Sequence, residues 1–326
     1  MQAAWYTAIG SAEEVLHVGE VDDPSPLAGE VLVEIKTSGV NPSDVKTRAG
    51  ARGELQFPRI IPHSDGGGII IKVGEGVSED RVGERVWIWN GAFGRAHGTC
   101  AEQMALPSSQ AIAMPENVSF ETAACLGIPA ATAYYGVFSD GSVEDQTILI
   151  TGGAGSVGNL GIQLAKWSGA DVISTVSSDD KATVAKAAGA DLVVNYKTGN
   201  VIEAVNDFTK GQGVDRILEV EFGGNLSVSE QVIKNNGVIA AYGSVAEANP
   251  SLPFYNLMFK GVKLNTYLIY IVSEKDRDDI NKGITSALSD SALTPIIAES
   301  FNLSEIINAH QSLEEGSVIG NVVINI

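Results

Sequence analysis

The chain has 326 residues, a formal net charge of −19 and 44% hydrophobic residues, which is typical of a globular protein with room for two domains. Nucleic-acid binding requires clustered lysines and arginines, so the acidic balance excludes nucleic acid as an expected partner. Cys100 and Cys125 are too few for a disulfide framework, and we expect both in the core. Since no signal peptide or membrane-spanning stretch is recognisable, we predict a cytoplasmic protein with no membrane partner.

Residues 1–120 form a region with a strand pattern. Apolar and charged residues alternate over several short stretches, which predicts half-buried strands, and prolines and glycine turns separate them. Short strands at this spacing predict a small irregular barrel. The three clearest strands are Glu30–Lys36, Gly68–Val73 and Arg85–Trp89. A helix is expected to begin at Ser119.

From Thr147 the pattern changes to alternating strands and helices, which predicts a doubly wound parallel sheet. The predicted strands are Thr147–Ile150, Asp171–Val176, Leu192–Tyr196, Val214–Val220, Gly237–Gly243 and Lys263–Ile269. The predicted helices of this region are Asp179–Ala188, Val201–Thr209 and Leu226–Asn235.

The last part of the chain carries two predicted helices, Ser273–Ser289 and Ser304–Leu313, followed by a strand at Gly320–Ile324. That strand has no partner except the sheet of the first domain. We therefore predict an α/β protein in which a Rossmann-type domain is inserted into a β-rich domain. The predicted segments are 1–122 (β-rich domain), 123–266 (nucleotide-binding domain) and 267–326 (return to the β-rich domain).

A glycine-rich turn lies between the strand at Thr147 and a helix that begins near Val157. The turn contains Gly152, Gly153, Gly155 and Gly158. Strand, glycine turn and helix form the context of a dinucleotide-binding turn, in which backbone N–H groups at a helix N-terminus meet a pyrophosphate.

The end of the next strand predicts which dinucleotide is bound. Sites that prefer NAD place an acid there for the ribose hydroxyls, but Val176 is followed by Ser177 and Ser178, with Lys181 three residues on. Hydroxyls and an ammonium are suited to a 2′-phosphate, which predicts NADPH. The alternative is an ordinary helix start, with Ser178 or Asp179 as N-cap and Lys181 in solvent.

An ordered set of motifs along the whole chain resembles the medium-chain dehydrogenase/reductase superfamily, specifically its zinc-independent quinone oxidoreductase (ζ-crystallin-like) branch. This resemblance implies a GroES-like β-rich domain around the Rossmann domain. The motifs are SGVNPSD at 38–44, PHSDGGG at 62–68, VGEGV at 73–77, VGERV at 82–86, GTCAE at 98–102, PAATAYY at 129–135, the glycine turn, GAD at 189–191, VNY at 194–196 and GNVV at 320–323.

The resemblance also implies that zinc is absent and where the cofactor binds. Zinc-dependent relatives carry a Cys where this chain has Asn41 and a His where it has Ser64, and neither substitute is a usual zinc ligand. This chain departs from the branch at Lys46, where tyrosine is common, at His63, where glycine is usual, and at Asn321, where many relatives have lysine. The implied cofactor-binding residues are Asn41, Thr132, Gly152, Gly155, Ser156, Val157, Gly158, Ser177, Ser178, Lys181, Tyr196, Gly243, Ser244, Leu268, Ile269 and Asn321.

The implied activity is hydride transfer from NADPH to a quinone. Two alternatives remain: reduction of the double bond of an enone or 2-alkenal, and an NADPH-binding structural or sensor protein with little turnover. No catalytic side chain is identified; Lys46, Arg48 and His63 are weak candidates for polarising a carbonyl oxygen. His310 lies on the apolar face of its helix and is expected in the core. Relatives dimerise through sheet edges, so the strand at 263–269 predicts a homodimer.

Overall fold

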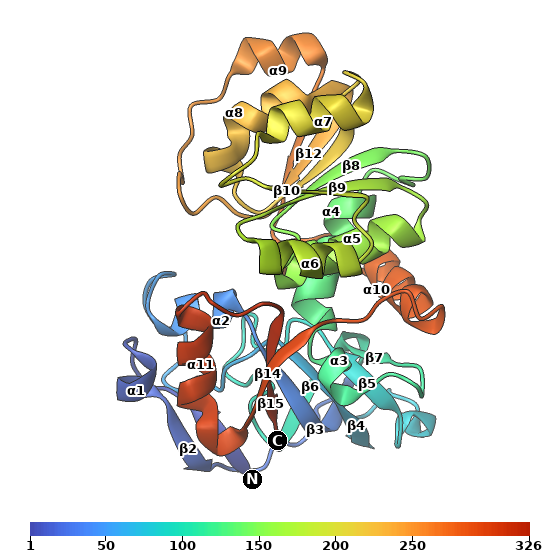
Figure 1. The fold of residues 1–326 in the computed structure, drawn as a ribbon. Helices are drawn as coiled ribbons and strands as arrows, with labels where there is room; N and C mark the ends of the chain where they lie inside the picture. Colours follow the sequence, from blue (N-terminus) through green and yellow to red (C-terminus); the bar gives the residue numbers. More distant parts are fainter. The chain divides into compact units, whose positions relative to one another are not determined.

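The computed structural model describes residues 1–326 and divides into two compact units (Figure 1). Unit 1 comprises Met1–Ile128 and Pro295–Ile326, and unit 2 comprises Pro129–Thr294. The α/β fold with an inserted parallel sheet is confirmed. The second boundary differs from the predicted one, because residues 267–294 belong to unit 2.

Contacts of helix α10 (Glu274–Ser289) explain this boundary. It packs on α4 (Ala131–Phe138) so closely that a Cβ atom at Gly283 would lie 2.1 Å from the ring of Tyr134. Further on, the Gln163 side chain hydrogen-bonds both the N–H and the carbonyl of Thr294. The polar sequence of α10 gave no sign of these contacts, which tie the segment to unit 2.

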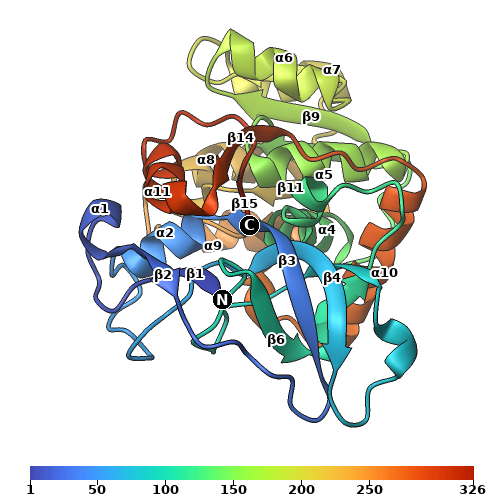
Figure 2. The ribbon, with the colours of Figure 1, turned by 90° about the horizontal axis from the view of Figure 1, so that it is seen from below.

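Unit 1 is built on a branched seven-stranded sheet in the order β14-β15-β3-β4-β5-β7, with β6 paired to β3. The long central strand β3 pairs antiparallel with β4, β6 and β15, and Figure 2 shows β6, β3 and β4 side by side. Its strands are β3 (Glu30–Val40), β4 (Asp65–Val73), β5 (Arg85–Ile88), β6 (Gln103–Pro107), β7 (Ala111–Ala113), β14 (Ile297–Asn302) and β15 (Asn321–Asn325). A separate ribbon joins β1 (Gln2–Trp5) to β2 (His17–Glu20).

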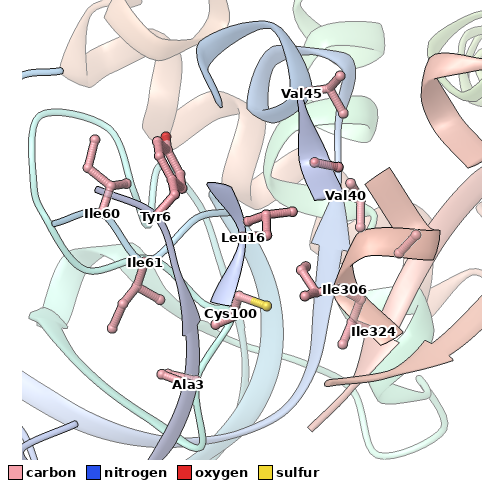
Figure 3. Packing of buried hydrophobic residues seen from close by; sticks show 14 of the residues in the cluster. Ala3, Tyr6, Leu16, Val40, Val45, Ile60, Ile61, Cys100, Ile306 and Ile324 are labelled. Carbon is pink, nitrogen blue, oxygen red and sulfur yellow. The ribbon is translucent and has the colours of Figure 1, made fainter. Parts of the chain in front are cut away.

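The helices of unit 1 are short and close its core. They are α1 (Ala12–Val15), α2 (Pro42–Arg48), α3 (Phe120–Ala123) and α11 (Ile306–Glu314). Figure 3 shows one hydrophobic cluster, in which Tyr6, Ile61, Cys100, Ile306 and Ile324 come from distant parts of the chain. The predicted return of the last strand is confirmed, since β15 pairs with β3. Ser119 caps α3 as predicted.

Unit 2 contains a six-stranded parallel sheet in the order β10-β9-β8-β11-β12-β13. This order is that of a doubly wound nucleotide-binding fold. Its strands are β8 (Thr147–Thr151), β9 (Asp171–Val176), β10 (Leu192–Asn195), β11 (Val214–Glu219), β12 (Ile233–Ala241) and β13 (Lys263–Thr266). Besides α4 and α10, its helices are α5 (Ser156–Trp167), α6 (Asp179–Ala187), α7 (Val201–Thr209), α8 (Phe222–Val232) and α9 (Phe254–Lys260).

Several elements of unit 2 differ from the predicted ones. Helix α8 begins at Phe222 rather than Leu226, because the Glu221 carboxylate caps it by accepting from the N–H of Gly224. Its C-terminal end is also earlier, since β12 already begins at Ile233. The strand predicted over Lys263–Ile269 ends at Thr266. It is the edge strand of the sheet; a homodimer through this edge stays a prediction, which sedimentation of the purified protein would test.

No helix of the chain combines the length and the apolar character needed to cross a bilayer. Both cysteines are buried free thiols, as expected for core residues.

Candidate functional site

The glycine turn lies between β8 and α5, and close packing of backbone on backbone shapes it. Gly152 has a φ of 70°, and a Cβ atom at Gly158 would lie 2.3 Å from the Gly152 carbonyl oxygen. The N-cap of α5 is Gly155, so no side chain caps the first turn of the helix. A helix N-terminus without a side-chain cap fits a phosphate group. The turn therefore fits the pyrophosphate of a dinucleotide.

The predicted 2′-phosphate residues lie beyond the carboxyl end of β9. Ser178 is the N-cap of α6 and accepts from the backbone N–H of Lys181 at 3.4 Å. Asp179 accepts from the side-chain amide of Asn195, and Ser177 and Lys181 are half-buried. Tyr196 directly follows β10 and is 53% exposed, so it is not a core aromatic. Ser178 thus has the capping role, and its neighbours are accessible to a ligand.

The remaining candidate residues of unit 2 come from three different segments. Gly243 accepts from the N–H of Phe222 through its carbonyl, and the Ser244 hydroxyl accepts from the N–H of Gly223 at 2.9 Å and donates to the Glu247 carbonyl. These bonds tie the loop after β12 to the start of α8. Thr132 is buried on α4, where its carbonyl accepts from the Tyr267 hydroxyl at 2.8 Å.

Leu268 and Ile269 have opposite environments. Leu268 is 44% exposed, whereas Ile269 is buried. The Arg277 guanidinium of α10 donates to the Ile269 carbonyl at 2.5 Å. Packing in the core therefore accounts for an apolar side chain at Ile269. It does not account for one at Leu268, which stays exposed.

In unit 1, Asn41 is held by two carboxylates. Its side-chain nitrogen donates to Asp65 Oδ2 at 2.7 Å, and its backbone N–H donates to Asp44 Oδ2 at 2.8 Å. Burial raises the pKa of the Asp44 carboxyl to about 7, against the hydrogen bonds from the Asn41 backbone and side chain and the charge of Arg52. Asn41 therefore presents an amide whose nitrogen is already committed to carboxylates.

Two of the three candidate catalytic residues are not available to polarise a carbonyl. Arg48 is completely buried, donates to the Gly10 carbonyl and forms an ion pair with Glu314 of α11. His63 is completely buried as well. Partners distant in the sequence therefore enclose both side chains within unit 1, which disfavours the predicted role for them. Lys46 is exposed on α2 and stays a candidate.

His63 is part of a hydrogen-bonded chain that the sequence did not reveal. Its Nε2 lies 2.9 Å from Nε2 of His310, and its Nδ1 lies 2.8 Å from the Ser38 hydroxyl. The Ser38 hydroxyl is 2.8 Å from that of Thr99, which lies 2.5 Å from the Asp65 carbonyl. His63 also has a φ of 77°, the left-handed region that favours glycine. The one signal in the sequence was a histidine at a position where the family resemblance implies glycine.

Asn321 and Ser64 complete the candidate residues of unit 1. Asn321 is buried at the start of β15, where its side-chain nitrogen donates to the Ile296 carbonyl at 3.0 Å. Ser64 is buried next to His63, and its carbonyl accepts from the N–H of Gly91. No three His, Cys, Asp or Glu side chains gather in a way that could hold a metal ion.

Comparison with known proteins agrees with this fold. Residues 27–139 match the alcohol dehydrogenase GroES-like domain family, and residues 156–284 match the zinc-binding dehydrogenase family. The chain is 30% identical to 2-methylene-furan-3-one reductase of Solanum lycopersicum over 100% of its own length and 79% of that protein. It is 26% identical to quinone oxidoreductase of Rattus norvegicus, over 97% and 95% of the two chains.

Two solved structures have the same fold along the full length of both chains. One is an NAD-dependent alcohol dehydrogenase, with a TM-score of 0.89 and 29% identity. The other is a mycobacterial protein complexed with NADPH, with a TM-score of 0.85 and 28% identity. The chain is thus an oxidoreductase with a Rossmann sheet inserted into a GroES-like domain. It belongs to the medium-chain dehydrogenase/reductase family, as its motifs predicted, and its relatives include quinone oxidoreductases.

Proposed function

We propose that this protein is a zinc-independent reductase that transfers a hydride from NADPH to a quinone. The observation that carries this proposal is the pairing of a glycine turn suited to a dinucleotide with an amide, Asn41, at the position of a zinc ligand in relatives. Asn41 donates its nitrogen to Asp65, which is a role in hydrogen bonding rather than in metal binding. The rat relative named quinone oxidoreductase supports the choice of acceptor.

Residues of unit 2 would hold the nucleotide. The N-terminus of α5, with Gly155 as its N-cap, would bind the pyrophosphate through backbone N–H groups. Ser178 and Lys181 would bind the 2′-phosphate through charge-assisted hydrogen bonds. Gly243, Ser244 and the segment Leu268–Ile269 would contact the nicotinamide half, with Arg277 holding the Ile269 carbonyl in place. NADPH, when bound, supplies the hydride.

A quinone requires little from the protein beyond orientation. After it receives a hydride it takes one proton from water to become the hydroquinone, so no acidic side chain is obligatory. A double-bond reductase is the second candidate, because the tomato relative named 2-methylene-furan-3-one reductase is 30% identical to this chain. In that reaction the hydride goes to the β-carbon of the enone and a proton to its α-carbon.

The acceptor is tested by steady-state oxidation of NADPH with a panel of quinones and 2-alkenals. We expect turnover with 1,4-benzoquinone and little turnover with 2-alkenals. The opposite preference would support the double-bond reductase. Tight NADPH binding without turnover of any acceptor would support a binding protein instead.

Cofactor preference is tested at Lys181. Removing its ammonium in a Lys181→Ala variant deletes a charge-assisted bond to the 2′-phosphate, so the KM for NADPH should rise about tenfold or more. The KM for NADH, which lacks this phosphate, should not change. Lys186→Ala, at the other end of α6, is the matched control and should leave both constants unaltered. Equal values of KM for the two cofactors in the unmodified protein would contradict the proposal.

A further inference from the structure

The buried chain His310–His63–Ser38–Thr99–Asp65 contains four contacts in which a hydrogen must be placed. With neutral imidazoles the four side chains offer one hydrogen each: one from each hydroxyl and one from each ring. A backbone carbonyl cannot donate, so the contact of Thr99 with the Asp65 carbonyl requires the hydrogen of Thr99. The placement of every other hydrogen follows from this one.

Since Thr99 donates to Asp65, the Ser38 hydroxyl must donate to Thr99. His63 must then donate from Nδ1 to Ser38, which leaves its Nε2 as an acceptor. His310 therefore donates from Nε2 to His63. The Nδ1 of His310 then carries no hydrogen, which agrees with the lack of any hydrogen-bond partner for that buried atom. The reverse order would bury an unpaired N–H at His310 and leave the Thr99–Asp65 contact without a hydrogen.

The surroundings of His63 and His310 favour uncharged imidazole rings. Burial lowers the pKa of both imidazoles, and Arg48 further disfavours a proton on His310. The chain ends on a backbone carbonyl, which passes no proton onward. It is therefore a fixed scaffold rather than a proton route to a substrate.

The scaffold ends at the residue that holds Asn41. Asp65 is bound at its carbonyl by Thr99 and accepts from Asn41 at its carboxylate. The Asn41 side chain also hydrogen-bonds the Asp44 carboxylate, and it accepts from the backbone N–H of Asp44 in the capping box of α2. Its nitrogen therefore faces two acids, and its Oδ1, which has two lone pairs, keeps one of them for a ligand. His63 is buried and has a φ of 77°. A residue in such a strained conformation needs several surrounding contacts to hold it in place.

We propose that His63 and His310 are positioning residues, which act through Ser38, Thr99 and Asp65 to orient the Asn41 amide with its oxygen toward the cofactor. The Oδ1 of Asn41 then accepts from the hydroxyl or carboxamide donors of the nicotinamide half. This role rests on the proposed function. The hydrogen placement and the orientation of Asn41 do not depend on it.

The test compares His310→Met, which removes the donor, with His310→Gln, whose amide nitrogen replaces it. Because residues in one hydrogen-bonded network are energetically coupled, His310→Met should weaken NADPH binding about tenfold. His310→Gln should weaken it less than about twofold. In an Asn41→Ala background, His310→Met should have no further effect. Equal effects of His310→Met in both backgrounds would overturn the proposal, and so would its lowering the free energy of unfolding without changing the Kd.

A second readout needs no cofactor. In ¹⁵N spectra His63 should carry its proton on Nδ1 and His310 on Nε2, and the side-chain amide of Asn41 should shift in His310→Met but not in His310→Gln. The exposed His17 provides a control, His17→Gln, that should move neither signal. Opposite tautomers, or an Asn41 amide unchanged in both His310 variants, would overturn the proposal. Absence of NADPH binding in the unmodified protein, with these spectra as expected, would overturn the proposed function alone.

Discussion

A Gly158→Ala variant is expected to lose about 3 kcal/mol of unfolding free energy, as for severe overpacking, and to lose measurable NADPH binding. The added Cβ would lie 2.3 Å from the Gly152 carbonyl oxygen and 3.1 Å from Gly153 Cα. Both contacts are with backbone, and the Gly152 carbonyl is already fixed by the N–H of Gly155 at 2.9 Å. Relief would therefore require the turn to open, which moves α5 away from β8. Urea unfolding and NADPH fluorescence titration measure the two effects.

Gly155→Ala is the matched control from the same turn. Its Cβ would meet only the Gly152 carbonyl oxygen, at 3.4 Å, and its φ of −77° suits any residue. The free energy of unfolding should change by less than about 0.5 kcal/mol. NADPH binding should still weaken about tenfold, because the methyl group stands where backbone must approach the pyrophosphate. If Gly158→Ala unfolds with the same free energy as the wild type, the steric explanation is wrong. If Gly155→Ala binds NADPH as tightly as the wild type, the pyrophosphate does not bind at this turn.

The elements that the sequence predicted best are those whose signals are local. The strand Asp171–Val176 and the helix Val201–Thr209 have the predicted bounds. The first is rich in β-branched residues (Val172, Ile173, Thr175 and Val176), which favour strands. The second begins at an Asn200 cap and carries a clear apolar face. In both, neighbouring residues contain all the information that the prediction needs.

Elements without such local signals were missed or misplaced. Helix α9 was not predicted, because Phe254–Lys260 is short and apolar on several sides, with Tyr255 and Phe259 exposed. The start of α8 was hidden by Gly223 and Gly224, which have low helix propensity. Its cap is the carboxylate of Glu221, which also accepts from the N–H of Val245 in a distant loop.

The same distinction applies to the candidate site. The glycine turn and the residues after β9 could be proposed as candidates from the sequence, because each motif is contiguous. The hydrogen-bonded chain of side chains around His63 could not be predicted, because its partner His310 is 247 positions away. The sequence predicted correctly that His310 would be buried in the core. It could not predict that another histidine would face it, since that contact arises only when α11 packs back on unit 1.

The histidine pair should also make the stability of the protein depend on pH. Burial and the neighbouring ring lower the pKa of His63, and burial with the charge of Arg48 lowers the pKa of His310 to about 3, from 6.5 for an ordinary histidine. Glu314 pairs with Arg48 rather than with either imidazole. Because the unfolded chain binds these protons more tightly, the stabilisation is complete above pH 6.5 and is lost as the pH falls toward 3. The expected loss is about 1.4 kcal/mol per pH unit for each histidine.

A His63→Asn/His310→Gln double variant isolates this effect, since asparagine tolerates the left-handed backbone of His63. Asp44, with its pKa raised to about 7, and Glu219, with its pKa also raised, act in the opposite sense. They are present in both proteins and cancel in the comparison. Between about pH 6 and pH 4, the wild-type free energy of unfolding should fall more steeply than that of the variant, by up to about 3 kcal/mol per pH unit. Urea unfolding across this range measures both slopes. Parallel curves would mean that the imidazoles titrate alike in the folded and unfolded chains, which is incompatible with two neutral rings buried against Arg48.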